Sequence, residues 1–317
     1  MPSPDNNRDT VLMLLTSDFV ATRYESLRRK APELKIVTEL AAGINDDVTA
    51  VFTFKLPTGI AARLPNLRLA ASVGAGADGI LSASDLPASV HVTRACDDGL
   101  GLSMAQYVVL QILRVFRDLP TLERQHASGE WNRLPLRDAT KCTVGIMGVG
   151  QTGSVVARTV ASLGFRVVGW TRTARDESDF KIFSGRETLP EFLSQCDFLV
   201  CLLPLTDSTR GMLNRSIFST VRKGCYVINA ARGGIVVEDD LLAAIDNEEL
   251  SGATVDVFDQ EPLPQSSPFW RHPKILVTPH SAAQPAVEPV VDQFIENLRR
   301  LSTGEPLMHV LNRDLGY

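Results

Sequence analysis

The chain has 317 residues, of which 44% are hydrophobic and 22% charged, and its formal net charge at pH 7 is −5. This composition is ordinary for packed protein and predicts roughly two domains of about 150 residues each. Because the net charge is negative and no block of like charge occurs, we expect no nucleic acid partner and no anionic membrane partner. The polar start MPSPDNNRD and the lack of a long apolar run predict neither signal peptide nor membrane span, and hence a cytoplasmic location.

The cysteines are scattered without a CxxC pair, and their odd number cannot all pair within one chain. They are Cys96, Cys142, Cys196, Cys201 and Cys225, and most lie within apolar, strand-like runs. We therefore interpret them as reduced thiols in the core rather than as metal ligands or redox groups, and we expect no metal site.

The first part of the chain predicts an α/β domain. Short apolar runs read as its strands: VLMLL (11–15), AVFTF (50–54), LRLAASVG (67–74) and VHVTR (90–94). Helical or loop segments separate them. The run from Leu100 to Leu119 then shows helical periodicity for about five turns, and we expect this helix to pass between two sheets.

From Thr143 onward, short apolar runs alternate regularly with amphipathic ones. The strand-like runs are TVGIMG, FRVVGW, DFLVCLLP, GCYVINAA, GATVDVF and ILVTPH, and the helix-like runs are GSVVARTVASLG, LPEFLSQC and VEDDLLAAIDN. Because continuous apolar strands separated by helices indicate a parallel sheet covered on both faces, we predict a doubly wound domain. A last helix, residues 287–304, is expected to fold back onto the first domain.

The predicted domain boundaries follow from this order of elements. We place the chain crossings near Asp98 and Gln284, which predicts a discontinuous domain of residues 1–98 and 285–317 and a second domain of residues 99–284. The fold class is therefore α/β, with two doubly wound parallel-sheet domains and a cleft between them.

A glycine-rich turn opens the second domain. Gly148, Gly150 and Gly153 form GxGxxG in GIMGVGQTG, between a predicted strand and a predicted helix. The glycines allow a tight turn, a close approach of backbone to a pyrophosphate and close helix packing, and the helix N-terminus offers free N–H groups. In this context the loop predicts dinucleotide binding by residues 148–153, with Val149, Gln151 and Thr152 between the glycines.

The end of the next strand carries hydroxyls and guanidinium groups where an acid usually binds the ribose of NAD. The stretch VGWTRTARD places Thr171, Arg172, Thr173 and Arg175 there. Hydroxyls and planar guanidinium forks suit a 2′-phosphate, whereas an acid would repel it. We therefore predict NADP(H) as the preferred cofactor, with NAD(H) possible, and we weigh this against two solvated arginines on an exposed loop.

Three polar residues follow predicted strand ends in the second domain, where ligands of open α/β sheets bind. They are Arg232 in INAARGGIV, Glu261 in VDVFDQEPLP and His280 in LVTPHSAA. A carboxylate beside a histidine favours the protonated ring, which a general acid for a carbonyl oxygen requires. An arginine with two parallel donors suits a substrate carboxylate.

Over nearly its whole length the chain resembles the D-isomer-specific 2-hydroxyacid dehydrogenases. The resemblance rests on VGIMGVGQTG, LLPLTDSTRGML, INAARGGIVVEDDLLAAI, GATVDVFDQEPLP, FWRHPKILVTPHSAA and the earlier VGAGADGIL. Within that family, WTRT, GLSM and the ending NRDLGY are most similar to glyoxylate/hydroxypyruvate reductase A enzymes. The resemblance implies a Rossmann cofactor domain and a flavodoxin-like substrate domain.

What the resemblance implies is NADPH-dependent reduction of a small 2-oxo acid, of glyoxylate or hydroxypyruvate type, to the D-2-hydroxy acid. Arg232 would hold the substrate's carboxylate and keto oxygen, His280 would donate a proton to that oxygen, and Glu261 would orient and charge His280. These three are the expected catalytic residues.

The resemblance also assigns residues around this centre. It places Ala75 and Gly76, in the loop Val73 to Asp78, at the substrate, and the glycines of that loop expose backbone N–H groups that suit a small carboxylate. A plain turn is the competing interpretation. Along the cofactor the resemblance places Leu203, Pro204, Thr209, Ala230, Asp256 and Ala282, with Asp256 near the nicotinamide amide.

The resemblance further implies a homodimer, since Trp131 falls in a segment that forms a dimer arm in related enzymes. There it would approach the neighbouring subunit's cleft or simply pack in the interface. Two departures from the family pattern bear on substrate fit: Gln106 stands where many relatives have an acid, and Ser281 stands where Ile or Val is common.

Two rival functions are weighed against this interpretation. Proteins of this fold also serve as nucleotide-sensing corepressors, but the chain has no long disordered flank and no basic patch. A formate dehydrogenase is disfavoured because formate has no keto group for His280 to protonate, and because that subfamily has Gln where Glu261 stands.

Overall fold

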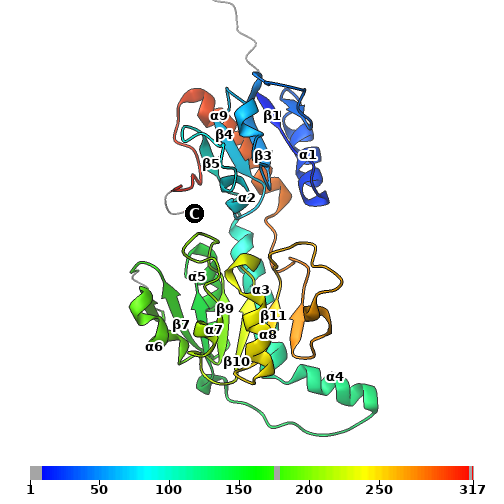
Figure 1. Ribbon diagram of the computed structural model, residues 1–317, viewed down its shortest axis with the longest axis vertical. Helices are drawn as coiled ribbons and strands as arrows, with labels where there is room; N and C mark the ends of the chain where they lie inside the picture. The colour runs from blue at the N-terminus through cyan, green and yellow to red at the C-terminus, as the bar shows by residue number, and fades with distance from the viewer. Residues whose placement is uncertain (1–8, 175–178, 314–315, 317) are drawn as a thin grey trace, which may run out of the picture. The chain divides into compact units, whose positions relative to one another are not determined.

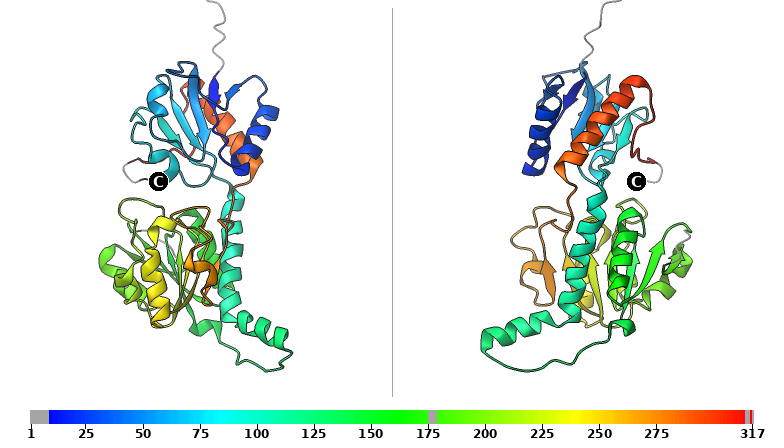
Figure 2. Two further views of the ribbon diagram at one scale, coloured as in Figure 1. Left: turned by 45° about the vertical axis from the view of Figure 1, so that its right-hand side comes forward. Right: turned by 180° about the vertical axis from the view of Figure 1, so that it is seen from behind.

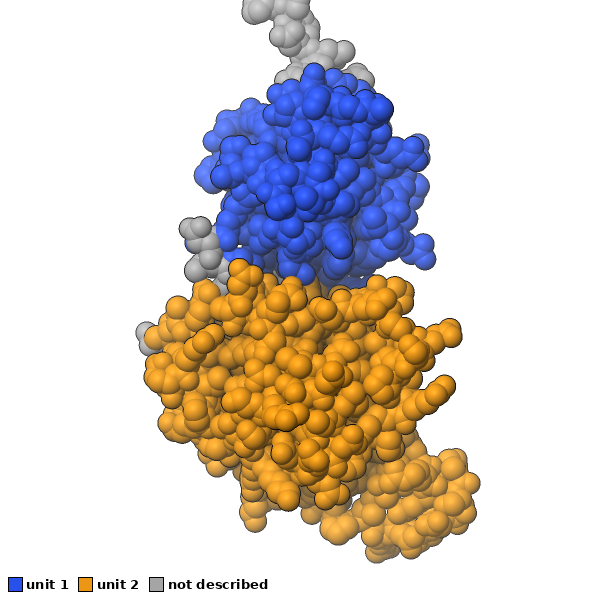
Figure 3. Space-filling model, in the orientation of Figure 1, with its two compact units in different colours: residues 1–99, 284–317 blue, residues 100–283 orange. Residues whose placement is uncertain are grey.

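The structure, a computed structural model, describes residues 9–174, 179–313 and 316. The chain divides into two compact units (Figure 3): unit 1 comprises Met1–Gly99 and Gln284–Tyr317, and unit 2 comprises Leu100–Ala283.

Within its described residues, unit 1 contains a five-stranded parallel sheet (Figure 1) with strand order β2-β1-β3-β4-β5. This order is that of flavodoxin-like folds. The strands are β1 (Thr10–Leu12), β2 (Lys35–Val37), β3 (Val48–Thr53), β4 (Leu69–Ser72) and β5 (His91–Thr93). The helices are α1 (Asp18–Lys30), η1 (Ala61–Arg63), α2 (Asp78–Leu81) and α9 (Val287–Thr303).

Helices α1 and α9 lie side by side on one face of this sheet (Figure 2). The ring of Phe294 in α9 stacks on Phe52 in β3, with centroids 4.2 Å apart. The segment after the last strand of unit 2 thus completes the core of unit 1. On the opposite face, α2 and the loops after β3 bury a second apolar cluster.

Unit 2 contains a seven-stranded parallel sheet with order β12-β11-β10-β9-β6-β7-β8 among the residues described. Its strands are β6 (Thr143–Met147), β7 (Arg166–Thr171), β8 (Lys181–Ser184), β9 (Phe198–Cys201), β10 (Cys225–Asn229), β11 (Leu250–Val255) and β12 (Ile275–Val277). The α-helices are α3 (Asp98–Phe116), which begins in unit 1, α4 (Leu119–Ser128), α5 (Gln151–Ser162), α6 (Leu189–Leu193), α7 (Arg215–Phe218) and α8 (Glu238–Asp246). Short 3-10 turns are η2 (Ala139–Lys141), η3 (Arg186–Thr188), η4 (Gly233–Ile235) and η5 (Pro268–Arg271).

Both faces of the unit 2 sheet are covered. Helices α3 and α5 pack on one face, and α6, α7 and α8 pack on the other. The strand order reverses between β6 and β9, as in the doubly wound dinucleotide-binding fold, and ligands of such sheets bind beyond the strand ends at this reversal. The prediction of two parallel-sheet α/β domains is confirmed.

Helix α3 is shorter than the sequence predicts. It ends at Phe116 rather than at Leu119, because Asp118 adopts a left-handed conformation (φ 53°) and Pro120 lies in the first turn of α4. The segment Gly99–Phe116 is long and apolar enough to cross a membrane by length and composition, which the sequence interpretation did not notice. Its buried residues pack in the same apolar cluster as strand β6 and helix α5 of unit 2.

Helix α4 and the segment after it stand away from the sheet of unit 2 (Figures 1 and 2). None of the ten residues of α4 is buried. Trp131 and Leu136 are 91% and 84% exposed. A helix this short is marginal on its own in water, so this projection is expected to pack against another surface.

Candidate active site

The glycine loop lies at the strand reversal, between β6 and α5. Gly148 has φ +99°, and a Cβ on it would lie 2.7 Å from the carbonyl oxygen of Leu202. A Cβ on Gly153 would lie 2.0 Å from the oxygen of Gly148, so no side chain fits there. A Cβ on Gly150 would meet open space, and the first turn of α5 carries neither an acid nor a capping side chain. The loop therefore presents helix N–H groups to a phosphate that can approach at Gly150.

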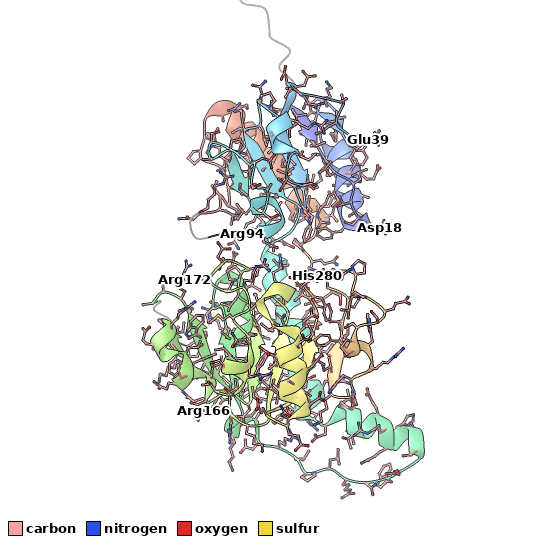
Figure 4. The ribbon with its side chains drawn as sticks, in the orientation of Figure 1. Asp18, Glu39, Arg94, Arg166, Arg172 and His280 are labelled. Atoms are coloured by element: carbon pink, nitrogen blue, oxygen red, sulfur yellow. The ribbon has the colours of Figure 1, made fainter. Side chains whose placement is uncertain are left out.

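The turn after β7 presents a guanidinium group and a hydroxyl. Arg172 and Thr173 are exposed, whereas Thr171 is buried and its hydroxyl donates to the carbonyl of Thr173 at 2.8 Å. Thr171 therefore shapes the turn that carries the other two. Arg172 lies at the end of unit 2 that also carries His280, whereas Arg166, at the start of β7, lies at the other end (Figure 4). Arg175 lies outside the described residues.

Arg232 follows β10, and hydrogen bonds to backbone carbonyls fix both its main chain and its side chain. The buried side chain of Asn229 donates to the carbonyl of Arg232 at 3.2 Å, and the guanidinium group donates to the carbonyl of Ala231 at 2.7 Å. A Cβ on Gly233 would lie 1.8 Å from the backbone of Phe258. The loop of Arg232 thus packs directly against the chain that leads to Glu261.

Glu261 and His280 form a hydrogen-bonded pair at the ends of neighbouring strands. Glu261 Oε2 lies 2.7 Å from His280 Nδ1, and Oε1 accepts the N–H of Phe258 at 2.9 Å. Desolvation alone would raise the pKa of Glu261, but the bonds from His280 and Phe258, together with the charges of His280 and Arg232, lower that pKa below its usual value. Glu261 is therefore a carboxylate that holds the ring of His280 through Nδ1.

The turn that carries His280 is organised by Asp256, which is 1% exposed. Asp256 Oδ1 accepts from the Thr278 hydroxyl at 2.6 Å and from the N–H of Ser281 at 2.9 Å, and Oδ2 accepts from the N–H of Ala282 at 2.9 Å. In α3, the Tyr107 hydroxyl lies 2.6 Å from the Thr278 hydroxyl. Sequence reasoning assigned Asp256 to the cofactor and missed Tyr107 and Thr278.

The other residues expected along the cofactor lie at neighbouring strand ends of unit 2. In the loop after β9, Leu203 is buried, and the hydroxyl of Thr209 donates to the carbonyl of Pro204 at 2.6 Å. Ala230, after β10, and Ala282, after β12, are both buried. Thr209 thus closes the loop after β9 upon itself.

In unit 1, the loop after β4 is shaped by Ser72. Its hydroxyl donates to the carbonyl of Gly76 at 2.6 Å and accepts the N–H of Gly74 at 3.1 Å. The side chain of Arg23 donates to the carbonyl of Val73 at 3.0 Å. The N–H groups of Ala75 and Gly76 donate to no acceptor in the described residues. Sequence reasoning missed Ser72 and Arg23, although a serine that ends the strand before VGAG offered a signal for the first.

The cysteines are free thiols, and all except Cys96 are buried. Burial raises the pKa of Cys201 to about 12, which makes this thiol unreactive. Within the part of the chain that the structure describes, no three His, Cys, Asp or Glu side chains gather as metal ligands do.

Comparison with known proteins places this geometry in a family. Residues 109–282 match the family described as D-isomer specific 2-hydroxyacid dehydrogenase, NAD binding domain. A D-isomer specific 2-hydroxyacid dehydrogenase from Xanthobacter autotrophicus, solved with NADPH and MES, is 36% identical with a TM-score of 0.89, and the match covers 98% of this chain and 100% of that one.

Two further solved structures are similar. An NADPH-dependent glyoxylate/hydroxypyruvate reductase from Sinorhizobium meliloti, solved with NADP and sulfate, is 33% identical with a TM-score of 0.90, over 98% of this chain and 100% of that one. A probable 2-hydroxyacid dehydrogenase from Rhizobium etli, solved with NADP, HEPES and L(+)-tartaric acid, is 28% identical with a TM-score of 0.88, over 98% and 99%. With its two parallel sheets, its glycine loop and its Glu261–His280 pair, this chain belongs to the D-isomer-specific 2-hydroxyacid dehydrogenase family.

Proposed function

We propose that the protein reduces a small 2-oxo acid, of glyoxylate or hydroxypyruvate type, to the D-2-hydroxy acid with NADPH. The observation that carries the proposal is the Glu261–His280 pair at 2.7 Å, at the same sheet edge as the glycine loop and Arg232. A carboxylate, an imidazole and a guanidinium group together meet the needs of carbonyl reduction.

His280 acts as the general acid. When bound, the nicotinamide supplies a hydride to the carbonyl carbon, which leaves negative charge on the oxygen. His280 donates its Nε2 proton to that oxygen and recovers a proton from solvent after the product leaves. Glu261 holds Nδ1, so the ring keeps its orientation toward the substrate oxygen. Arg232 binds the substrate carboxylate and the developing oxyanion, both of which need charged donors.

Arg172 and Thr173 support the choice of NADPH. Both are exposed at the carboxyl end of β7, and residues 171–174 contain no acid that would repel a 2′-phosphate. The open approach at Gly150 suits the pyrophosphate. The solved relatives from X. autotrophicus and S. meliloti hold NADPH and NADP, respectively. NAD(H) is the weaker candidate.

Unit 1 is proposed to bind the substrate. In its loop after β4, the N–H groups of Ala75 and Gly76 have no acceptor among the described residues. The bonds from Ser72 and Arg23 hold neighbouring carbonyls of the loop inward. Adjacent free N–H groups form a nest for an anion, which suits a small carboxylate.

We further propose that the protein is a cytoplasmic homodimer in which a second copy covers α4 and the segment after it. This projection has no buried residue in α4 and exposes Trp131 and Leu136. Leu136→Asp is expected to shift the sedimentation coefficient toward the monomer, because a charge cannot be buried in an apolar contact without large cost. Wild-type protein that sediments as a monomer would exclude the dimer.

The test of the activity is NADPH oxidation with a panel of glyoxylate, hydroxypyruvate, pyruvate and phenylpyruvate. We expect turnover with glyoxylate or hydroxypyruvate, and chiral chromatography of the hydroxypyruvate product should show the D-isomer. His280→Ala serves as the inactive control. Failure of all four acids, or formation of the L-isomer, would contradict the proposed reaction.

A further inference from the structure

The backbone of His280 is held in a conformation that a histidine rarely adopts. Its φ is +51°, in the left-handed region, where non-glycine residues are uncommon. Such a conformation persists only when surrounding contacts determine it, and it is typical of functional sites.

Asp256 accepts hydrogen bonds from His280 and from residues on both sides of it in the chain. Its backbone carbonyl accepts the N–H of His280 at 2.8 Å, and its carboxylate accepts the N–H groups of Ser281 and Ala282 at 2.9 Å each. The hydroxyl of Thr278 donates to the same carboxylate at 2.6 Å. The Asp256 carboxylate thus binds the chain before His280, through Thr278, and after it, through Ser281 and Ala282.

Tyr107 orients Thr278. A threonine hydroxyl has one proton, and Thr278 gives it to Asp256. The Tyr107 hydroxyl, 2.6 Å away, must then be the donor to the Thr278 oxygen. Burial is the main reason why the pKa of Tyr107 is raised, so this hydroxyl keeps its proton. The hydrogen bonds form a directed chain from Tyr107 through Thr278 to Asp256.

We propose that Tyr107 and Thr278 are positioning residues that hold the turn of His280, through Asp256, in the geometry needed for proton donation. This inference rests on the proposed reductase function, in which His280 is the acid. Tyr107 lies in α3, whose apolar face is packed on the unit 2 sheet, so the anchor of the chain is rigid. Neither residue needs to touch the substrate or the cofactor for this role.

Matched variants test the proposal. Thr278→Val removes the hydroxyl at nearly constant shape, whereas Thr278→Ser keeps it. We expect Tyr107→Phe to lower kcat about 3- to 10-fold, the factor that one neutral hydrogen bond supplies, with unchanged KM for NADPH. Thr278→Val should lower kcat about 10-fold or more, because the lost hydroxyl donates to a carboxylate. Thr278→Ser should stay within about twofold of the wild type, and the double variant should lose little more than the larger single loss, since both groups act through one chain.

A readout independent of turnover accompanies the kinetics. Hydrogen exchange of the Ser281 and Ala282 amides, which donate to Asp256, should be about threefold or more faster in Thr278→Val and Tyr107→Phe than in the wild type. Tyr226→Phe is the control, because it removes a similar buried bond, 3.0 Å from Tyr226 to Thr254, that does not touch the turn. The control should leave both readouts unchanged.

The outcomes separate this proposal from the proposed function. Faster exchange in the two variants but not in the control supports the positioning role even if no 2-oxo acid is turned over. Unchanged exchange, equal kcat for Thr278→Val and Thr278→Ser, or additive losses in the double variant overturns it, even if the wild type is an active reductase.

Discussion

Replacing Arg172 by alanine should lower kcat/KM for NADPH more than kcat/KM for NADH. A charge-assisted hydrogen bond contributes about 1.5–3 kcal/mol, which corresponds to about 10- to 150-fold in binding. Because Arg172 is exposed, solvent and salt screen its charge, and the lower end applies. We therefore expect Arg172→Ala to lower kcat/KM for NADPH about 10-fold and to change kcat/KM for NADH less than about threefold. Initial rates with a saturating 2-oxo acid measure both.

The control is Arg166→Ala, which removes an exposed arginine at the opposite end of the same strand (Figure 4). This variant should leave kcat/KM for NADPH and for NADH unchanged. The loss in Arg172→Ala should also shrink as the salt concentration rises. Equal losses for NADPH and NADH, or a wild type that prefers NADH, would refute the assignment of Arg172 to the 2′-phosphate.

The remaining predictions concern the acid, its partner and a buried charge. His280→Ala and Arg232→Ala should each lower kcat at least about 100-fold, because each removes a group that binds the developing oxyanion; near wild-type turnover would exclude the mechanism. Since the pKa of Glu261 is lowered in the folded protein, its pair with His280 stabilises the fold above the usual glutamate pKa and is lost as the pH falls through the lowered value. The Tm difference between wild type and Glu261→Gln should therefore be present at pH 6 and vanish in acid, and it should be small because the pair is about a third exposed. Arg23→Met should lower the free energy of unfolding by about 2–4 kcal/mol, because Arg23, which is 1% exposed, donates to the carbonyls of Val73 and Pro285, and both would lose this donor; an unchanged denaturation midpoint would argue against this.

Periodicity predicts every central strand, and it also predicts the edge strands His91–Thr93 and Ile275–Val277, which lie in apolar runs. The runs that begin at Thr143 and at Phe198 are continuous and apolar, and both lie in the middle of the unit 2 sheet. The strands Lys35–Val37 and Lys181–Ser184 were missed, because they are short, lie at sheet edges and are half exposed. An edge strand needs no strong apolar pattern, so its signal is weak.

In the candidate site, too, some residues could be predicted from the sequence and others could not. Its charged residues follow strand ends and could be found from local patterns, as with Arg232 and His280. The groups that hold them could not, because Tyr107 and Thr278 are 171 positions apart and meet only once the sheet and α3 have formed. Arg23 was also hidden, since arginine is usually exposed and nothing in its neighbourhood marks a buried one.

The stacking of Phe294 on Phe52 has a consequence for the order of folding during synthesis. Unit 2 is inserted between the two segments of unit 1, so the ribosome finishes it first. At about 5–20 residues per second, β3 waits on the order of ten to fifty seconds for the helix that covers it. The nascent chain therefore exposes the part of the apolar sheet face that α9 later covers, beside α1, and this gives chaperones a defined window in which to bind it.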